Sequence, residues 1–98
     1  MEVQFAKAKL RRLDAERGFT GGLSPALVKA FRKKTQLIRA AVNEQDLHAY
    51  QAIRFERLSG KRQHQYSMRL NDQYRLVVEL EGSSPNKVVV VINIEDYH

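Results

Sequence analysis

The pattern of apolar and polar positions changes from helical to strand-like near the middle of the chain. In the first half, apolar residues recur at steps of three and four, the spacing that places side chains on one face of a helix. It predicts a short amphipathic helix from about Ala6 to Gly18, and a longer helix that is capped by Ser24, begins at Pro25 and continues to Val42. Serine followed by proline favours a helix start, because serine caps the first turn and the missing N–H of proline has no partner there anyway.

The second half alternates apolar and polar residues in four segments, 52–58, 66–71, 74–81 and 88–95. Such alternation is typical of strands with one buried face. In the last segment Val88, Val90, Ile92 and Ile94 are expected to face the helices. The pattern therefore predicts an α+β fold, with two N-terminal helices packed on a small antiparallel β-sheet, in a single domain over residues 1–98.

The same alternation predicts the register of the central hairpin. Leu70 and Tyr74 share the buried face only if the loop is residues 71–73, which places Arg69 directly opposite Arg75 on the other face. Facing arginines destabilise a sheet unless an anion lies between them, and two guanidinium groups suit a phosphate. The alternative is two arginines that splay apart into water.

Composition narrows the function classes. The formal net charge is +6, which favours a polyanionic partner. The chain has no cysteine, which excludes a disulfide framework and a thiolate zinc site, and its three scattered histidines favour neither a metal site nor a cofactor. No apolar stretch has the length of a signal peptide or a membrane helix, so we expect a soluble cytoplasmic protein without membrane contact.

Positive charge is concentrated between residues 54 and 75, where the loop 58–67 is the most basic part. A basic, glycine-containing loop beside a basic strand face is a candidate phosphodiester-binding rim. The candidate RNA-binding residues are Arg57, Lys61, Arg62 and Arg69. The second predicted helix carries its own basic face, with Lys33 and Lys34 among others; a solvated helix face is the commoner explanation and a nucleic-acid surface the alternative.

Three stretches together resemble a known family: "ERLSG", "QYSMRLNDQYRLVVE" and the terminal "VVVVINIEDYH". They are similar to the HigB branch of the RelE/ParE toxin superfamily, bacterial toxins that are paired with a DNA-binding antitoxin. The resemblance is strongest over residues 55–98. It implies a compact fold of two helices on a small antiparallel sheet, and ribosome-dependent endonuclease activity on mRNA.

The resemblance also implies site residues. Asp96, Tyr97 and His98 match the family's terminal motif, and Arg75 matches the arginine that ends its Trp/Tyr-Arg strand signature. Arg69 matches an arginine that many members carry earlier in the hairpin. These residues form the expected catalytic and phosphate-binding set.

Two positions depart from the family pattern. Glu56 stands where some members have a histidine, and Ser59-Gly60-Lys61 stands where many have Lys-Gly-Asp. A carboxylate at Glu56 is still able to take a proton, so it remains a candidate catalytic residue. Lys61 or Arg62 would hold the phosphate in place of the displaced lysine.

Metal-free RNA cleavage uses the 2′-hydroxyl of the substrate as nucleophile, so the protein must move protons and stabilise charge on the phosphate. An imidazole titrates near pH 6.5 and suits this proton transfer, which makes His98 the expected principal acid or base. Asp96 would orient His98, while Arg75 and Arg69 would stabilise the charged phosphate. Tyr97 would stack on a base or orient the phosphate.

The resemblance implies partners as well: the ribosome, mRNA and a HigA-like antitoxin with a helix-turn-helix domain, joined to the toxin in a hetero-oligomer. Two other functions stay open. One is a DNA gyrase poison of the same fold, as in the ParE branch, although the terminal Asp96-Tyr97-His98 does not mark that branch. The other is a non-catalytic basic domain that contacts nucleic acid through its second helix.

Overall fold

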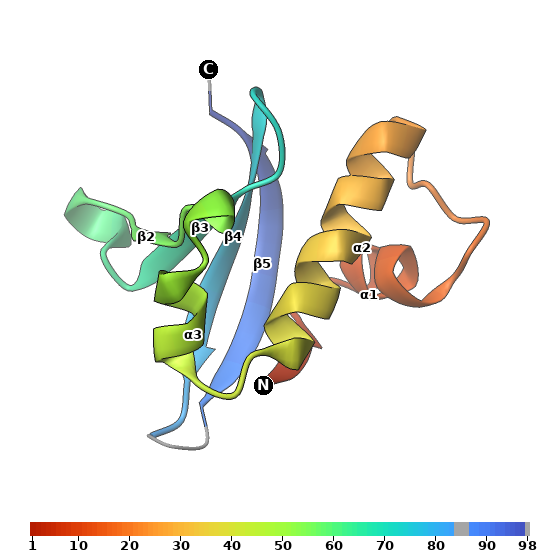
Figure 1. The fold of residues 1–98 in the computed structure, drawn as a ribbon. Helices are drawn as coiled ribbons and strands as arrows, with labels where there is room; N and C mark the ends of the chain where they lie inside the picture. Colours follow the sequence, from red (N-terminus) through yellow and green to blue (C-terminus); the bar gives the residue numbers. More distant parts are fainter. Residues whose placement is uncertain (84–86, 98) are drawn as a thin grey trace.

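A computed structural model describes residues 1–83 and 87–97. Within them, three α-helices lie against a five-stranded sheet of order β1-β5-β4-β3-β2 (Figure 1). In chain order the elements are β1 (Glu2–Phe5), α1 (Ala8–Ala15), α2 (Pro25–Ala40), α3 (Glu44–Ala49), the 3-10 helix η1 (Gln51–Ile53), β2 (Glu56–Arg57), the 3-10 helix η2 (Gly60–Arg62), β3 (Gln65–Arg69), β4 (Tyr74–Glu81) and β5 (Val88–Asp96). The predicted α+β fold is confirmed.

Helix α2 begins as its sequence predicts. Ser24 is the N-cap, and its Oγ accepts a hydrogen bond from the backbone N–H of Leu27 at 3.2 Å, while Pro25 occupies the first turn. Phe31, Thr35 and Ile38 continue the buried stripe at helical spacing. The helix therefore owes its position to one apolar face, because that face packs into the core.

The N-terminal segment differs from the prediction. Residues before α1 form the short strand β1, which pairs in parallel with β5 from Glu2 opposite Val88 to Phe5 opposite Val91. The predicted helix is correspondingly shorter at both ends, Ala8–Ala15. Pairing with β5 makes this segment a strand. The sequence did not predict it because four residues are too few to show a strand period.

Helix α3 was not predicted. The side chain of Asn43 caps it by accepting from the N–H of Asp46 at 3.2 Å, and Leu47 is its one buried residue. One apolar contact in six residues leaves no helical period to detect. The predicted strand over 52–58 is likewise reduced to β2, although Ile53 and Phe55 are buried as its alternation indicated.

The central hairpin has the predicted register. Arg69 lies opposite Arg75, and Met68 lies opposite Leu76. The loop is held by Asn71, whose Oδ1 accepts the backbone N–H groups of Gln73 at 2.9 Å and Tyr74 at 2.7 Å. Asparagine side chains favour such turns because they replace a backbone acceptor.

Strand β5 contains an irregularity that reverses its faces. Val77 pairs with Asn93 and Val78 with Val91, so one residue of β5 between those partners has no counterpart on β4. Before the bulge Val89 and Val91 are fully buried, and the prediction that Val88 and Val90 face the helices is wrong. After the bulge Ile94 packs against the core, as predicted. The extra residue moves successive side chains to the opposite face of the strand.

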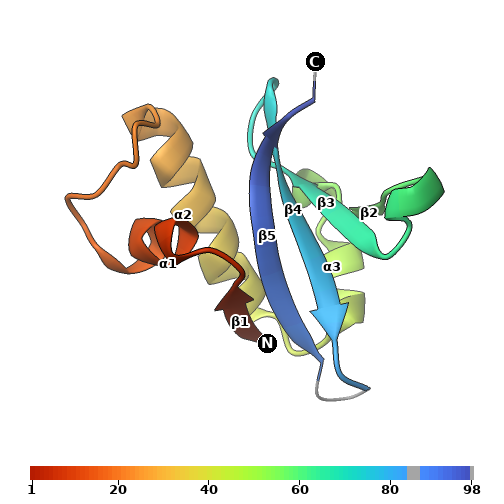
Figure 2. The ribbon, with the colours of Figure 1, turned by 180° about the vertical axis from the view of Figure 1, so that it is seen from behind.

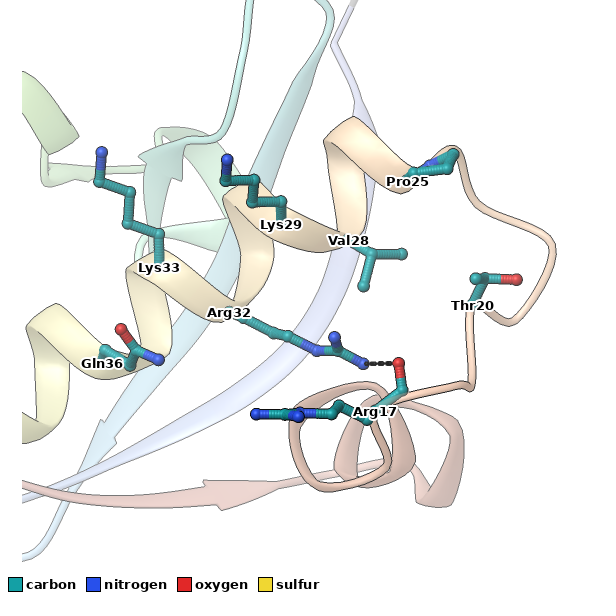
Figure 3. A pocket seen from close by; sticks show the side chains of 8 residues that line it. All are labelled: Arg17, Thr20, Pro25, Val28, Lys29, Arg32, Lys33 and Gln36. Atoms are coloured by element: carbon teal, nitrogen blue, oxygen red, sulfur yellow. Dashed lines mark hydrogen bonds between the residues drawn. The ribbon is translucent and has the colours of Figure 1, made fainter.

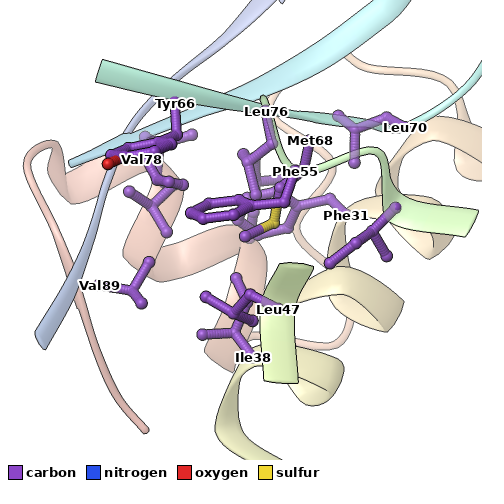
Figure 4. Close-up of a cluster of buried hydrophobic side chains, with 14 of the residues drawn as sticks. Phe31, Ile38, Leu47, Phe55, Tyr66, Met68, Leu70, Leu76, Val78 and Val89 are labelled. Carbon is purple, nitrogen blue, oxygen red and sulfur yellow. The ribbon is translucent and has the colours of Figure 1, made fainter. Parts of the chain in front are cut away.

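The core lies between the helices and one face of the sheet (Figure 4). It joins residues of α2, α3 and β3–β5, including Phe31, Leu47, Met68, Leu76 and Val89. Figure 2 shows the sheet from the other side, with α3 behind β3 and β4. We call this second side the open face, and it carries the paired Arg69 and Arg75.

Arg32 ties α2 to the end of α1. Its Nε donates to the carbonyl of Leu13 at 2.7 Å, and its guanidinium also donates to the carbonyl of Glu16 at 2.7 Å. Figure 3 shows a further hydrogen bond, to the carbonyl of Arg17 at 3.3 Å. A cation at the C-terminal end of a helix satisfies carbonyls that have no partner within the helix.

Replacing Arg32 with alanine is expected to lower the free energy of unfolding by roughly 1.5–3 kcal/mol, the range for hydrogen bonds to a charged group. Urea denaturation measures this change. Lys33→Ala is the matched control, because Lys33 is exposed on the same helix. Equal stability of the two variants would contradict the structural role of Arg32.

Candidate functional site

A small pocket of about 170 Å³ opens on the open face of the sheet. It is lined by Arg54, Glu56, Ser67, Arg69, Arg75 and Tyr97. Five elements or their flanks supply these side chains: the end of η1, β2, β3, β4 and the end of β5. Three arginines and one carboxylate thus line a space large enough for a small anion.

The facing arginines of the hairpin are only partly neutralised. Arg69 pairs with the exposed Asp72 of the loop, and the guanidinium of Arg75 lies 3.6 Å from a carboxylate oxygen of Glu95. Within the described residues, the buried Nε of Arg75 has no hydrogen-bond partner. An N–H group shielded from water and left without an acceptor is costly.

Tyr97 is docked against the hairpin loop. Its backbone N–H donates to the carbonyl of Gln73 at 3.1 Å, and its hydroxyl donates to the carbonyl of Asn71 at 3.2 Å. Its ring centroid lies 5.7 Å from the guanidinium carbon of Arg75, within the range of a cation–π contact. The hairpin loop therefore holds this aromatic ring beside the anion pocket.

Asp96 lies outside the anion pocket. It pairs with Tyr74 across the ladder, on the helix-facing side of the sheet, and its carboxylate accepts a hydrogen bond from Gln73 Nε2 at 2.9 Å. Asp96 is accordingly absent from the pocket lining that includes Arg75 and Tyr97. His98 lies outside the described residues, so its predicted role, and that of Asp96 in orienting it, stay predictions.

The sequence of the chain also matches a known protein family. A family model described as "RelE-like toxin of type II toxin-antitoxin system HigB" matches residues 3–98. The chain belongs to this HigB-like toxin family. A toxin of a type II system has an antitoxin as its partner. Family membership therefore confirms the prediction of an antitoxin partner.

The fold of the toxin is also found among solved structures. The "YoeB/ParE toxin from Agrobacterium tumefaciens" superposes with a TM-score of 0.65 at 15% sequence identity, over the full length of both chains. At this identity the likeness concerns the fold alone. No curated protein matches the toxin sequence.

The predicted RNA-binding residues of the toxin are placed differently from one another. Arg62 in η2 reaches the open face, where it donates to both carboxylate oxygens of Glu95 at 3.0 and 2.7 Å. The side chain of Arg57 lies on the helix-facing side of the sheet, where it donates to the hydroxyl of Tyr66 at 2.6 Å. Lys61 is exposed in η2. Of the four, only Arg69 lines the pocket.

Two residues of this region were missed by the sequence reasoning. Arg54 lines the pocket; its sequence signals were its place at the start of the basic stretch 54–75 and its alternation with the buried Ile53 and Phe55. Glu95 bridges Arg62 and Arg75, and its signal was that it precedes the terminal motif on the strand face opposite the core. Both became visible only when β2, β4 and β5 were placed together.

Glu95 makes the stability of the toxin depend on pH. Hydrogen bonds from Arg62 hold its pKa below the ordinary value of 4.5, although partial burial acts in the other direction. A lowered pKa in the folded state stabilises the fold above pH 4.5, and this stabilisation is lost as the pH falls through the folded-state pKa. Glu95→Gln is therefore expected to lose less stability than the wild type between pH 7 and pH 3.

Urea denaturation at the two pH values measures this difference. Glu79→Gln is a suitable control, because Glu79 also lies on the open face but is bonded by Gln65 and flanked by His64 rather than by an arginine pair. An identical pH dependence for Glu95→Gln and wild type would contradict the stabilising role of the Arg62–Glu95 pair.

A larger pocket, of about 580 Å³, lies between α2 and the α1–α2 loop (Figure 3). Lys29, Lys33 and Arg17 line it together with Arg32, whose guanidinium is already bonded to backbone carbonyls.

Over residues 1–83 and 87–97, no group of three His, Cys, Asp or Glu side chains is arranged to hold a metal ion. In the same part of the chain, no helix is both long and apolar enough to span a membrane.

Proposed function

We propose that this toxin is a ribosome-dependent mRNA endonuclease that inhibits translation in the cytoplasm. The observation that carries the proposal is the pocket in which the facing Arg69 and Arg75 meet Glu56 and Tyr97. Membership in the HigB-like toxin family supports it, because the pocket residues include the family's arginine and terminal tyrosine. A phosphodiester is the anion that such a pocket and a net charge of +6 would select.

The proposed reaction breaks the bond between phosphorus and the 5′-oxygen of the following nucleotide. The 2′-hydroxyl attacks the adjacent phosphorus, which forms a 2′,3′-cyclic phosphate and releases a 5′-hydroxyl. Glu56 in the pocket would take the 2′ proton, and His98 would give a proton to the leaving oxygen. A general acid or base of this kind contributes roughly 10²–10⁴-fold to the rate.

The arginines would stabilise the charge that accumulates on the phosphate in the transition state. Arg75 lines the pocket beside Arg69, and the contact between its guanidinium and Glu95 is as long as 3.6 Å. Electrostatic stabilisation by groups already in place is often the largest contribution to catalysis. Tyr97, fixed by the hairpin loop, would stack against a base or orient the phosphate.

The antitoxin partner is proposed to cover basic surface of the toxin and to carry a helix-turn-helix domain that binds its own promoter. An unneutralised nuclease of this kind would stop translation in the cell that makes it. A hetero-oligomer of toxin and antitoxin is therefore the expected resting form.

A reconstituted translation system with one defined mRNA tests the proposal. We expect cleavage when ribosomes translate the mRNA and little cleavage of the same RNA without ribosomes. Primer extension locates the cut, and enzymatic removal of 2′,3′-cyclic phosphates identifies the product end. Arg75→Ala supplies the matched inactive protein.

Two outcomes would favour other functions. Inhibition of DNA gyrase supercoiling without mRNA cleavage would assign the toxin to the gyrase poisons. The basic pocket on α2 favours a second candidate, a non-catalytic nucleic-acid contact. If charge reversal at Lys33 and Lys34 abolished growth arrest while loss of His98 did not, that candidate would replace the nuclease.

A further inference from the structure

Arg54 has an unusual backbone conformation. Its φ and ψ angles are 47° and 64°, in the left-handed region, and it is the only non-glycine residue with positive φ in residues 1–83 and 87–97. A Cβ atom makes this conformation unfavourable, so glycine or asparagine usually occupies it. An arginine here needs a reason of its own, and strained residues often mark functional sites.

Packing explains the turn but does not explain the arginine. Arg54 ends η1 and separates Ile53 from Phe55, which are both buried in the core. The left-handed residue lets the chain direct both neighbours inward. Glycine would make the same turn without the steric cost, so the packing requires the conformation and leaves the side chain unexplained.

The side chain of Arg54 lines the anion pocket with Arg69 and Arg75. Arg69 is paired with Asp72, and Arg75 lies near Glu95. For Arg54, an exposed residue, the part of the chain that the structure describes contributes no hydrogen bond or ion pair to the guanidinium. It brings a third positive charge to a pocket where two arginines already face each other and Glu56 supplies one negative charge, so the pocket lining keeps an excess of positive charge that an anion would balance.

We propose that Arg54 is a third phosphate-binding residue of the toxin, which closes the pocket around the RNA phosphate from the side of η1. The proposal rests on the proposed nuclease function, since it assigns another residue to the same site. A guanidinium offers several donors in one plane and binds phosphate oxygens through two of them. The left-handed backbone is retained with arginine because it directs this fork into the pocket.

The variants at position 54 separate the contribution of the arginine side chain from that of the left-handed backbone conformation. Arg54→Gly removes both the guanidinium and the strain, Arg54→Ala removes the guanidinium alone, and Arg54→Lys keeps the charge without the fork. Arg11→Ala is the matched control, because Arg11 is an exposed arginine of α1 outside the pocket. Each protein is compared with the wild type in three measurements.

The first measurement is thermal unfolding without phosphate. We expect Arg54→Gly to raise the Tm by about 2–4 °C and to exceed Arg54→Ala, since glycine accepts positive φ. The second is inorganic phosphate binding, followed by NMR, in which both variants should weaken the affinity about tenfold. The third is cleavage of translated mRNA, which should fall about tenfold or more, with Arg54→Lys intermediate and Arg11→Ala unchanged.

A wild-type affinity and cleavage rate in Arg54→Ala would overturn the proposal while leaving the nuclease function intact. A Tm well below that of the wild type for both Arg54→Ala and Arg54→Gly would also overturn it, because the arginine would then be structural. If the wild type cleaved no translated mRNA, the nuclease function would fail; weaker phosphate binding by Arg54→Ala would then still support Arg54 as an anion-binding residue.

Discussion

Replacing Arg75 with alanine is expected to lower the rate of mRNA cleavage by about 10²–10³-fold, the usual effect of removing one donor that stabilises transition-state charge. The guanidinium lines the anion pocket, and its Nε is buried without an acceptor among the described residues. Arg75→Lys should recover only part of the activity, because an ammonium group lacks the planar fork. Single-turnover cleavage of mRNA on programmed ribosomes measures both rates.

Thermal stability is the control measurement for the Arg75→Ala variant. Among residues 1–83 and 87–97, the contacts of the Arg75 guanidinium are a 3.6 Å pair with Glu95 and a ring contact with Tyr97, so its loss should leave the Tm close to that of the wild type. A folded Arg75→Ala protein that cleaves at the wild-type rate would show that the pocket is not where the phosphate reacts. Loss of activity together with loss of folding would point to a structural role.

Replacing His98 with alanine is expected to lower cleavage by roughly 10²–10⁴-fold, the contribution of a general acid or base. Histidine suits this role because its ordinary pKa, near 6.5, lets it exchange a proton at cellular pH. The wild-type rate should therefore depend on pH around neutrality, and the variant should lose that dependence. Cleavage rates between pH 5 and pH 8 provide the measurement.

His48→Gln is the matched control, since His48 lies on α3 against Glu44 and Phe55 and outside the pocket. Unchanged cleavage by His98→Ala would remove His98 from the mechanism. Glu56, which lines the pocket, would then be the principal proton-transfer group, and Glu56→Gln would carry the large effect instead.

The parts of the fold that were predicted correctly depend on neighbours in the sequence. The cap at Ser24 and the stripe through Phe31 and Ile38 place α2, because helix spacing repeats within a few residues. Strand alternation on both sides of a short loop likewise determined that Arg69 faces Arg75. The predicted facing arginines made an anion site one of two interpretations before any tertiary contact was known, the other being that they splay apart into water.

Other features followed from contacts that have no local signature. Strand β1 exists because Glu2–Phe5 pairs with β5, more than 80 residues away. The bulge in β5 inverted the face expected for Val88 and Val90, because one unpaired residue reverses all side chains that precede it relative to those that follow. Alternation alone cannot reveal where such a residue lies.

The sequence by itself determined the basic charge, the α+β fold class, the two facing arginines and the terminal Asp96-Tyr97-His98. The tertiary structure decided which charges meet. It placed Arg54 and Tyr97 in the pocket, paired Arg62 with Glu95 across 33 positions, and put Asp96 on the other side of the sheet. The physical reason is that strand period fixes a side chain's face only within one strand, whereas bulges and long-range pairing fix which faces come together.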